Sequence, residues 1–174
     1  VFVFLIIVNA INFIDGIDGL AITEVIKAII LIEFFSSNFT NLNMLGFIVI
    51  FSMLPLYYFN FKKRRKVFLG DAGSLLLGTL MAIYIFYILG DKFNFDINWT
   101  INKVLFSVLV LFYPLVDLLR VFIVRIKNRK SPFHPDSSYI HHILRDKGIN
   151  HLKTVEILLT IVVFFISLSI FFIN

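Results

Sequence analysis

Long apolar blocks recur along this chain, and they constrain its fold more than any other feature. A bilayer core of about 30 Å is crossed by about 20 mostly apolar residues in a helix. Because backbone groups in lipid must satisfy their hydrogen bonds internally, and because the short alternating blocks of a membrane barrel are missing, the blocks predict helices. We expect an all-α fold, a polytopic transmembrane helix bundle of about six membrane segments with the first one truncated. The blocks cover approximately residues 1–8, 20–35, 44–60, 73–90, 102–124 and 154–173.

The composition agrees with a lipid environment. The 174 residues are 59% hydrophobic and 16% charged, whereas soluble domains are about 45–50% apolar and about 25% charged. A soluble core of this size could not bury so much apolar surface. The net charge of +5 does not indicate nucleic-acid binding, because the basic residues lie in short runs between apolar blocks, as juxtamembrane charges do. The absence of cysteine excludes disulfides, thiolate metal sites and a cysteine nucleophile.

The start of the chain predicts that a longer protein precedes it. Val1 lies within an apolar stretch that has no charged region or small-residue cleavage site, so it does not resemble a signal peptide. We expect the truncated end of a spanning helix here and the C-terminal part of a longer chain. Because there is no internal repeat or low-complexity linker, residues 1–174 are expected to form a single transmembrane domain.

The basic residues predict the orientation of the segments in the membrane. They cluster at 62–66 and within 125–153, whereas the loops at 36–43 and 91–100 contain a single basic residue, Lys92. Lysine and arginine mark cytoplasmic loops. The alternation of segments then places the stretches at 9–19, 61–72 and 125–153 on the cytoplasmic side. The run at 62–66 is mainly a topology signal, with a secondary role in attracting anionic lipid phosphate or nucleotide.

The first candidate motif reads NAINFIDGIDGL at residues 9–20. Asn12, Asp15 and Asp18 recur at intervals of three, which brings them together in a helix or a tight turn. Gly16 and Gly19 allow the backbone to lie close to a ligand. A helix-to-helix turn with an aspartate N-cap would explain one acid but not two at the membrane edge, where ionisable residues are costly and usually functional.

The second candidate motif reads FLGDAGSL at residues 68–75. Asp71 and Ser74 fit the N-cap of the following helix, where the helix dipole favours an acid. Alternatively, a carboxylate beside exposed helix N–H groups, preceded by five basic residues, suits Mg²⁺ together with phosphates. Both interpretations stay open on these residues alone.

The third candidate motif, at residues 131–142, contains SPFHPD followed by YIHH. Its prolines break any helix, and Asp136 or Ser137 can then cap a short one. In such a helix His141 and His142 would point about 100° apart and contact different groups. Zinc is poorly supported without cysteine or an HExxH pattern. The histidines are either solvated or donate hydrogen bonds to a diphosphate.

Two acid–base pairs inside the apolar blocks are expected to be structural. Glu24 and Lys27, like Asp117 and Arg120, stand three residues apart, a spacing that lets side chains pair on a helix. Asp117 lies about 12 Å along the helix from Arg125. Whether Asp117 faces the site cavity stays open.

Together, the three motifs resemble those of the polyprenyl-phosphate N-acetylhexosamine-1-phosphate transferases (glycosyltransferase family 4). NxxNFxDGxDGL, FLGDAGSL and SPFHPD…HH occur in the family's order, over essentially all 174 residues. The likeness is closest to the undecaprenyl-phosphate GlcNAc-1-phosphate transferases that initiate enterobacterial antigen or teichoic acid. It implies transfer of a sugar-1-phosphate from a UDP-N-acetylhexosamine, with UDP-GlcNAc the expected donor, to undecaprenyl phosphate, with release of UMP. The site would face the cytoplasm at the bacterial inner membrane.

The resemblance also implies residue roles and partners. Asp15, Asp18 and Asp71 would be catalytic, and Asp71 with Asn12 would bind Mg²⁺, or Mn²⁺ in its place. The partners would be the two substrates and membrane lipid, not nucleic acid, and a homodimer is left open. The substrate-contacting residues would be Asn9, Asn12, His134, Asp136, His141 and His142.

The chain departs from the family's pattern in three ways. Ser137 stands where the family usually has arginine, and Tyr139 stands where it has histidine. No Asp-Asp pair occurs in the chain, although the family carries one on an earlier cytoplasmic loop. A complete enzyme would have about ten or eleven spans, so this piece is expected to be inactive by itself. The alternatives are an inactive or split subunit, or a transporter with cation-binding acids at broken helices, for which we find no inverted repeat.

Overall fold

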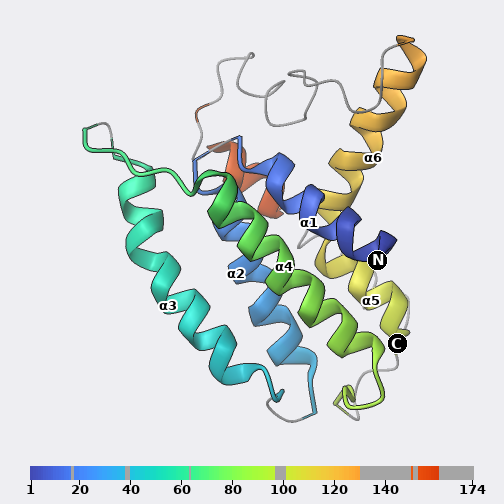
Figure 1. Ribbon diagram of the computed structural model, residues 1–174. Coiled ribbons are helices and arrows are strands. Elements are labelled where there is room, and N and C mark those ends of the chain that lie inside the picture. Colours follow the sequence, from blue (N-terminus) through green and yellow to red (C-terminus); the bar gives the residue numbers. More distant parts are fainter. Residues whose placement is uncertain are drawn as a thin grey trace.

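The computed structural model describes residues 1–16, 18–37, 40–62, 64–96, 101–129, 150 and 153–160. In these parts the regular structure is helical, and an isolated antiparallel bridge joins Ser36 to Phe95. The all-α prediction is therefore confirmed (Figure 1). The helices are α1 (Phe2–Ile14), α2 (Leu20–Phe35), α3 (Asn43–Asn60), α4 (Gly70–Leu89), α5 (Lys103–Val110) and α6 (Phe112–Lys127), with a further helical stretch at 153–160.

The packing of α1 against α4 forms the centre of the bundle. At their crossing a Cβ atom on Gly78 would lie 2.8 Å from the Cα of Val8, so only glycine lets the two backbones come this close. Small residues play this part at helix interfaces in membranes. On either side of the crossing, Ile11 and Met81 are fully buried. Sequence positions far apart in the chain are thus held in register.

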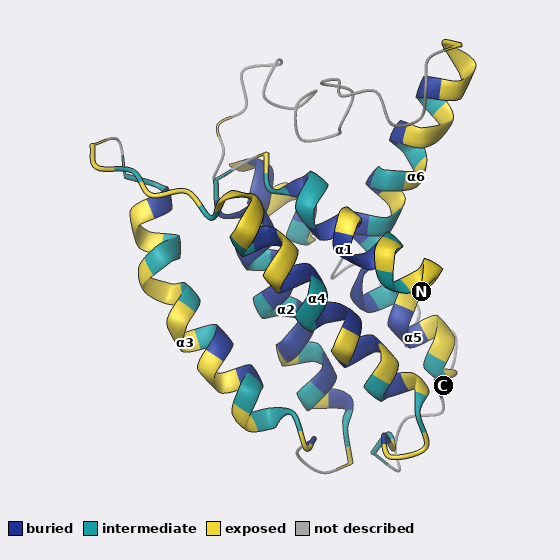
Figure 2. Cartoon of the chain, in the orientation of Figure 1, coloured by how far each residue is buried: buried dark blue, intermediate teal, exposed yellow. Residues whose placement is uncertain are grey.

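Helix α3 stands away from the rest of the bundle, and Figure 2 shows that little of it is buried. Its buried residues are Gly46, Val49 and Asn60. The Tyr84 hydroxyl of α4 donates a hydrogen bond of 2.9 Å to the Leu42 carbonyl just before α3. The outer face of α3 carries large apolar side chains such as Phe51, which would be costly in water and suit lipid.

Two of the described helices, α3 and α4, are long and apolar enough to cross a membrane. The bent pair α5 and α6 would make a third span. Helices α1 and α2 have 13 and 16 residues, fewer than the about 20 of a straight span. Most of the last apolar block, 161–174, lies outside the described residues.

The prediction of a single helix over 102–124 was wrong, because the helix is broken at Leu111. Helices α5 and α6 meet there at 77°. The break precedes Pro114, which has no N–H to offer Val110 and whose ring crowds the preceding turn. After the break the helix starts again, with the Leu115 N–H bonded to the Leu111 carbonyl at 3.1 Å.

The end of α1 and the start of α4 also differ from the bounds of the apolar blocks. Helix α1 runs on to Ile14 instead of ending near residue 8, so Asn9 and Asn12 are helical. Both asparagine side chains have hydrogen-bond partners there, which removes the usual reason for such residues to leave a helix. Helix α4 begins at Gly70, before the apolar block that starts near residue 73, and Asp71 lies in its first turn, as the second motif predicted.

The crossing at Gly78 gives a direct test of the packing. Gly78→Ala adds a methyl group against the Val8 backbone and is expected to destabilise the protein by about 1–3 kcal/mol. Gly90→Ala is the matched control, because a Cβ there would meet its nearest atom at an ordinary 3.4 Å. Thermal unfolding in detergent measures both; equal melting temperatures for the two variants would contradict this packing.

Candidate functional site

Three chain segments meet at one end of the bundle, uppermost in Figure 1. They are the C-terminal turn of α1, the tight turn into α2, and the first turn of α4. These segments carry the first two predicted motifs. Side-chain contacts and electrostatic interactions join them.

A hydrogen bond between side chains ties the first motif to the second. The Asn12 Nδ2 donates to the Ser74 Oγ at 2.7 Å, across 62 residues of sequence. Ser74 is fully buried, and its hydroxyl in turn donates to the Asp71 carbonyl at 3.2 Å. This bond fixes the orientation of the Asn12 amide, whose oxygen is the only atom of that group that could bind a cation.

Asp15 shares this site with two other carboxylates. It follows the last residue of α1, and its N–H donates to the Asn12 carbonyl at 3.2 Å. Burial, and to a smaller extent the negative charges of Asp71 and Asp18, raise the pKa of the Asp15 carboxyl from 3.8 to about 7. Asp15 is therefore close enough to Asp71 and to Asp18 for their negative charges to repel its own.

The turn that holds Asp18 requires a glycine. Gly19 has a φ of 74°, in the left-handed region, and a Cβ there would lie 2.4 Å from a ring atom of Phe61. Its carbonyl accepts hydrogen bonds from the N–H and the hydroxyl of Thr23, at 2.9 and 2.7 Å. The turn is thus fixed against the end of α3 and by the first turn of α2.

A basic side chain from the loop after α3 reaches the same site. The Lys66 Nζ forms an ion pair with the Asp18 carboxylate. The sequence predicted a cytoplasmic basic run here but not this contact, because Lys66 and Asp18 lie 48 residues apart and no spacing rule links them.

The donor atoms at this site fit Mg²⁺. Carboxylate and amide oxygens are its preferred protein ligands, and the ion usually keeps several waters and binds substrate phosphates as well. Within the described ranges, no three or more His, Cys, Asp or Glu side chains lie so that they could hold a metal ion together. Asp71 and the Asn12 amide could therefore supply only part of the shell of such an ion, whose charge would also reduce the repulsion that Asp15 experiences.

The predicted site residues have different outcomes. The structure brings Asn12, Asp15, Asp18 and Asp71 together. Asn9 lies on the exposed side of α1, where its amide donates to the Leu5 carbonyl at 2.7 Å. The remaining predicted residues belong to the third motif and lie outside the described residues, as do Ser137 and Tyr139. These predicted residues are His134, Asp136, His141 and His142.

The two pairs expected to be structural do form. Glu24 is buried and paired with Lys27. Asp117, with no exposed surface, accepts a hydrogen bond of 3.2 Å from the Tyr113 hydroxyl and lies 3.8 Å from the Arg120 guanidinium. Both acids have basic partners one turn along their own helix.

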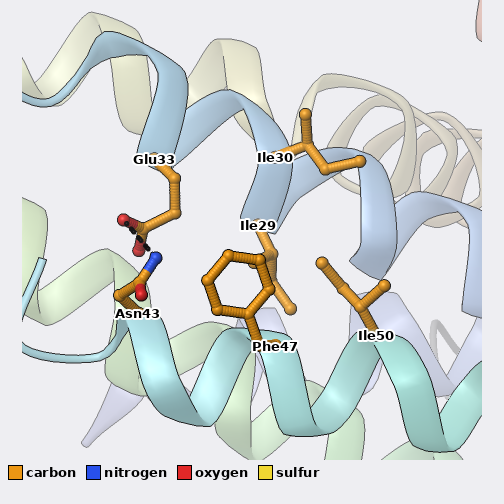
Figure 3. A pocket seen from close by; sticks show the side chains of 6 residues that line it. All are labelled: Ile29, Ile30, Glu33, Asn43, Phe47 and Ile50. Carbon is orange, nitrogen blue, oxygen red and sulfur yellow. Dashed lines mark hydrogen bonds between the residues drawn. The ribbon is translucent and has the colours of Figure 1, made fainter. Parts of the chain in front are cut away.

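A crevice of about 190 Å³ between α2 and α3 lies apart from the acidic site (Figure 3). Its polar end is Glu33, which accepts hydrogen bonds from the Thr40 N–H and hydroxyl at 3.1 and 2.5 Å and from the Asn43 amide at 3.4 Å. These bonds fasten the loop between the two helices, which is a structural role. The lining residues are Ile29, Ile30, Glu33, Asn43, Phe47 and Ile50.

The raised pKa of Asp15 predicts a pH-dependent gain in stability for Asp15→Asn in EDTA. Asp15 ionises at lower pH in the unfolded chain than in the folded protein. The folded protein therefore loses stability relative to the unfolded chain as pH rises from about 4 to about 7. The substitution removes this loss. The melting temperature of the variant should therefore exceed that of the wild type by a margin that grows up to about pH 7 and then levels.

Thermal unfolding in detergent between pH 5 and 8.5 measures this margin. Asp91→Asn, at an exposed position just after α4, is the control for loss of any carboxylate. A margin that stays constant across this pH range would show that Asp15 does not bear the proposed repulsion.

Comparison with known proteins gives consistent matches. Residues 1–89 match the family model described as glycosyl transferase family 4. The chain is 33% identical over 154 residues to the "probable undecaprenyl-phosphate N-acetylglucosaminyl 1-phosphate transferase" of Bacillus subtilis (strain 168). This alignment covers 87% of this chain and 41% of that protein. It is 32% identical to the decaprenyl-phosphate N-acetylglucosaminephosphotransferase of Mycobacterium leprae, in an alignment that covers 95% of this chain and 46% of that protein.

A third relative is the undecaprenyl-phosphate alpha-N-acetylglucosaminyl 1-phosphate transferase of Escherichia coli (strain K12). The identity is 32% over 146 residues, covering 81% of this chain and 38% of that protein. The chain therefore spans less than half the length of these curated relatives. No solved structure matches the chain.

Proposed function

The chain belongs to glycosyl transferase family 4, and from that premise we propose that it forms part of a polyprenyl-phosphate GlcNAc-1-phosphate transferase. The proposed reaction moves GlcNAc-1-phosphate from UDP-GlcNAc to undecaprenyl phosphate and releases UMP. The relatives are named for transfers of this kind, to undecaprenyl or decaprenyl phosphate. Their names support both the sugar and the lipid class of the acceptor.

The gathering of Asp15, Asp18 and Asp71 is the observation that carries the proposal. In the proposed reaction an oxygen of the acceptor phosphate attacks the sugar-bearing phosphorus of UDP-GlcNAc, and the bond to UMP breaks. Two anionic phosphates must come together, so catalysis depends on positioning and on charge neutralisation. A bound Mg²⁺ would supply that neutralisation.

Each residue of the site has a role in this proposal. Asp71 and the Asn12 side-chain oxygen would hold the Mg²⁺, and Ser74 fixes the Asn12 amide for that purpose. Asp15 and Asp18 would line the pocket beside the diphosphate. The acceptor phosphate has a second pKa of about 6, so its attacking oxygen is largely ionised at neutral pH. That oxygen therefore needs to be oriented toward the phosphorus and does not need a strong base.

The position of the site suits a lipid acceptor. The chain is a membrane-integral protein, and the site lies at an end of the bundle, where a polyprenyl phosphate could present its headgroup. Basic residues mark the same end: Arg64 and Lys66 in the loop before α4, and Lys127 in the last turn of α6. Because basic residues mark cytoplasmic loops, we propose that the site faces the cytoplasm at the bacterial inner membrane.

Turnover by the product of the full open reading frame tests the proposal. The protein in detergent is expected to release UMP from UDP-GlcNAc only with undecaprenyl phosphate and Mg²⁺ present. Asp71→Asn should lower this rate at least ~100-fold, because it removes a charged ligand of the metal. Asp91→Asn is the matched control and should leave the rate unchanged.

Two outcomes would contradict the proposal. Unchanged turnover in Asp71→Asn would remove Asp71 from the metal site. Absence of UMP release by a folded wild-type protein would favour an inactive subunit, or a transporter if cation flux appeared in proteoliposomes.

A further inference from the structure

The ion pair between Lys66 and Asp18 places a cation inside the acidic site. The two side chains are 29% and 14% exposed, so the pair is only partly open to solvent. The same ammonium lies 4.9 Å from the centre of the Phe68 ring. Lys66 is therefore held between the first two motifs instead of extending into water.

The loop that carries Lys66 is built to hold it there. The buried Asn60 at the end of α3 donates a hydrogen bond of 2.7 Å to the Val67 carbonyl, and the Val67 N–H bonds to the Phe59 carbonyl at 3.4 Å. Arg65 adopts a φ of 57°, an uncommon conformation for a residue other than glycine. The chain thus doubles back onto the end of α3 and directs residue 66 toward the turn at Gly19.

Another lysine of the same loop behaves differently. The Lys62 ammonium lies over the rings of Tyr58 and Phe59, 4.4 and 4.6 Å from their centres. Its described contacts are with aromatic rings of α3, whereas those of Lys66 include an acid of the site. The two lysines therefore form a matched pair with equal charge and unequal access to the carboxylates.

We propose that Lys66 is a built-in counter-ion of the acidic site that exchanges its partner when substrate binds. In the empty site its ammonium offsets the charge of Asp18. When the UDP-sugar diphosphate enters together with a divalent cation, the ammonium becomes a hydrogen-bond donor to a diphosphate oxygen, and Asp18 becomes available to the cation. This inference rests on the function proposed above.

Charge and chemistry both support the exchange. A divalent cation near Asp18 repels the ammonium, whereas a diphosphate brings several anionic oxygens that attract it. Lysine is a compact charge with three donors on a flexible stem, which suits a change of partner better than a rigid guanidinium does. Hydrogen bonds from an ammonium to phosphate are among the stronger kinds in proteins.

The proposal predicts effects of opposite sign on two ligands. Lys66→Met removes the competing positive charge, so Mn²⁺ alone should bind about three- to tenfold more tightly. UDP in the presence of Mg²⁺ should bind at least ~10-fold more weakly, because a donor to the diphosphate is lost. Lys62→Met should leave both affinities unchanged.

Mn²⁺ titration followed by EPR and UDP titration by calorimetry measure these affinities in the full-length protein. Thermal unfolding establishes that each variant is folded, and Lys66→Gln replaces Lys66→Met if the latter fails to fold. Unchanged affinities, or changes of the same sign for Mn²⁺ and UDP, would overturn the proposal and leave Lys66 a structural or topological lysine. If the wild type binds neither Mn²⁺ nor UDP, the proposed function fails instead.

Discussion

The close crossing of α1 over α4 is the constraint on which the rest of this structure depends. It needs Gly78, because any side chain there would meet the backbone of Val8. The hydrogen bond from Asn12 to Ser74 joins the same two helices one helical turn nearer the site. The first two motifs, whose bonded side chains are 62 residues apart in the sequence, thereby form one site. Packing between apolar helix faces is thus what makes the polar chemistry possible.

The site gathers charges that repel one another, and this repulsion explains much of its design. Burial and neighbouring acids keep the pKa of Asp15 near 7, so the empty site is under electrostatic stress at neutral pH. Lys66 offsets part of that stress by pairing with Asp18. A divalent cation with a bound diphosphate would offset it more completely, so the same repulsion that destabilises the empty protein favours binding.

Much of the fold and part of the site could be predicted from the sequence, because both rest on local patterns. Apolar blocks identified α2 and α3, and the spacing of the acids identified the residues that gather with Asn12. The break at Leu111 was missed because an apolar block hides Pro114, which alone marks it. The extension of α1 and the contact of Lys66 were missed because each depends on partners distant in sequence, which no spacing rule reveals.

The proposal depends on Asp71 holding one divalent cation that lies close enough to Asp15, at the end of another helix, for the charge of Asp15 to attract it. Counting bound Mn²⁺ and measuring its affinity in the wild type, Asp15→Asn and Asp71→Asn tests it most directly. We expect one tight Mn²⁺ per chain in the wild type and at least ~10-fold weaker binding in each variant, because each variant loses a charge from the same site. Wild-type affinity for Mn²⁺ in both variants would show instead that these acids do not act on the same cation.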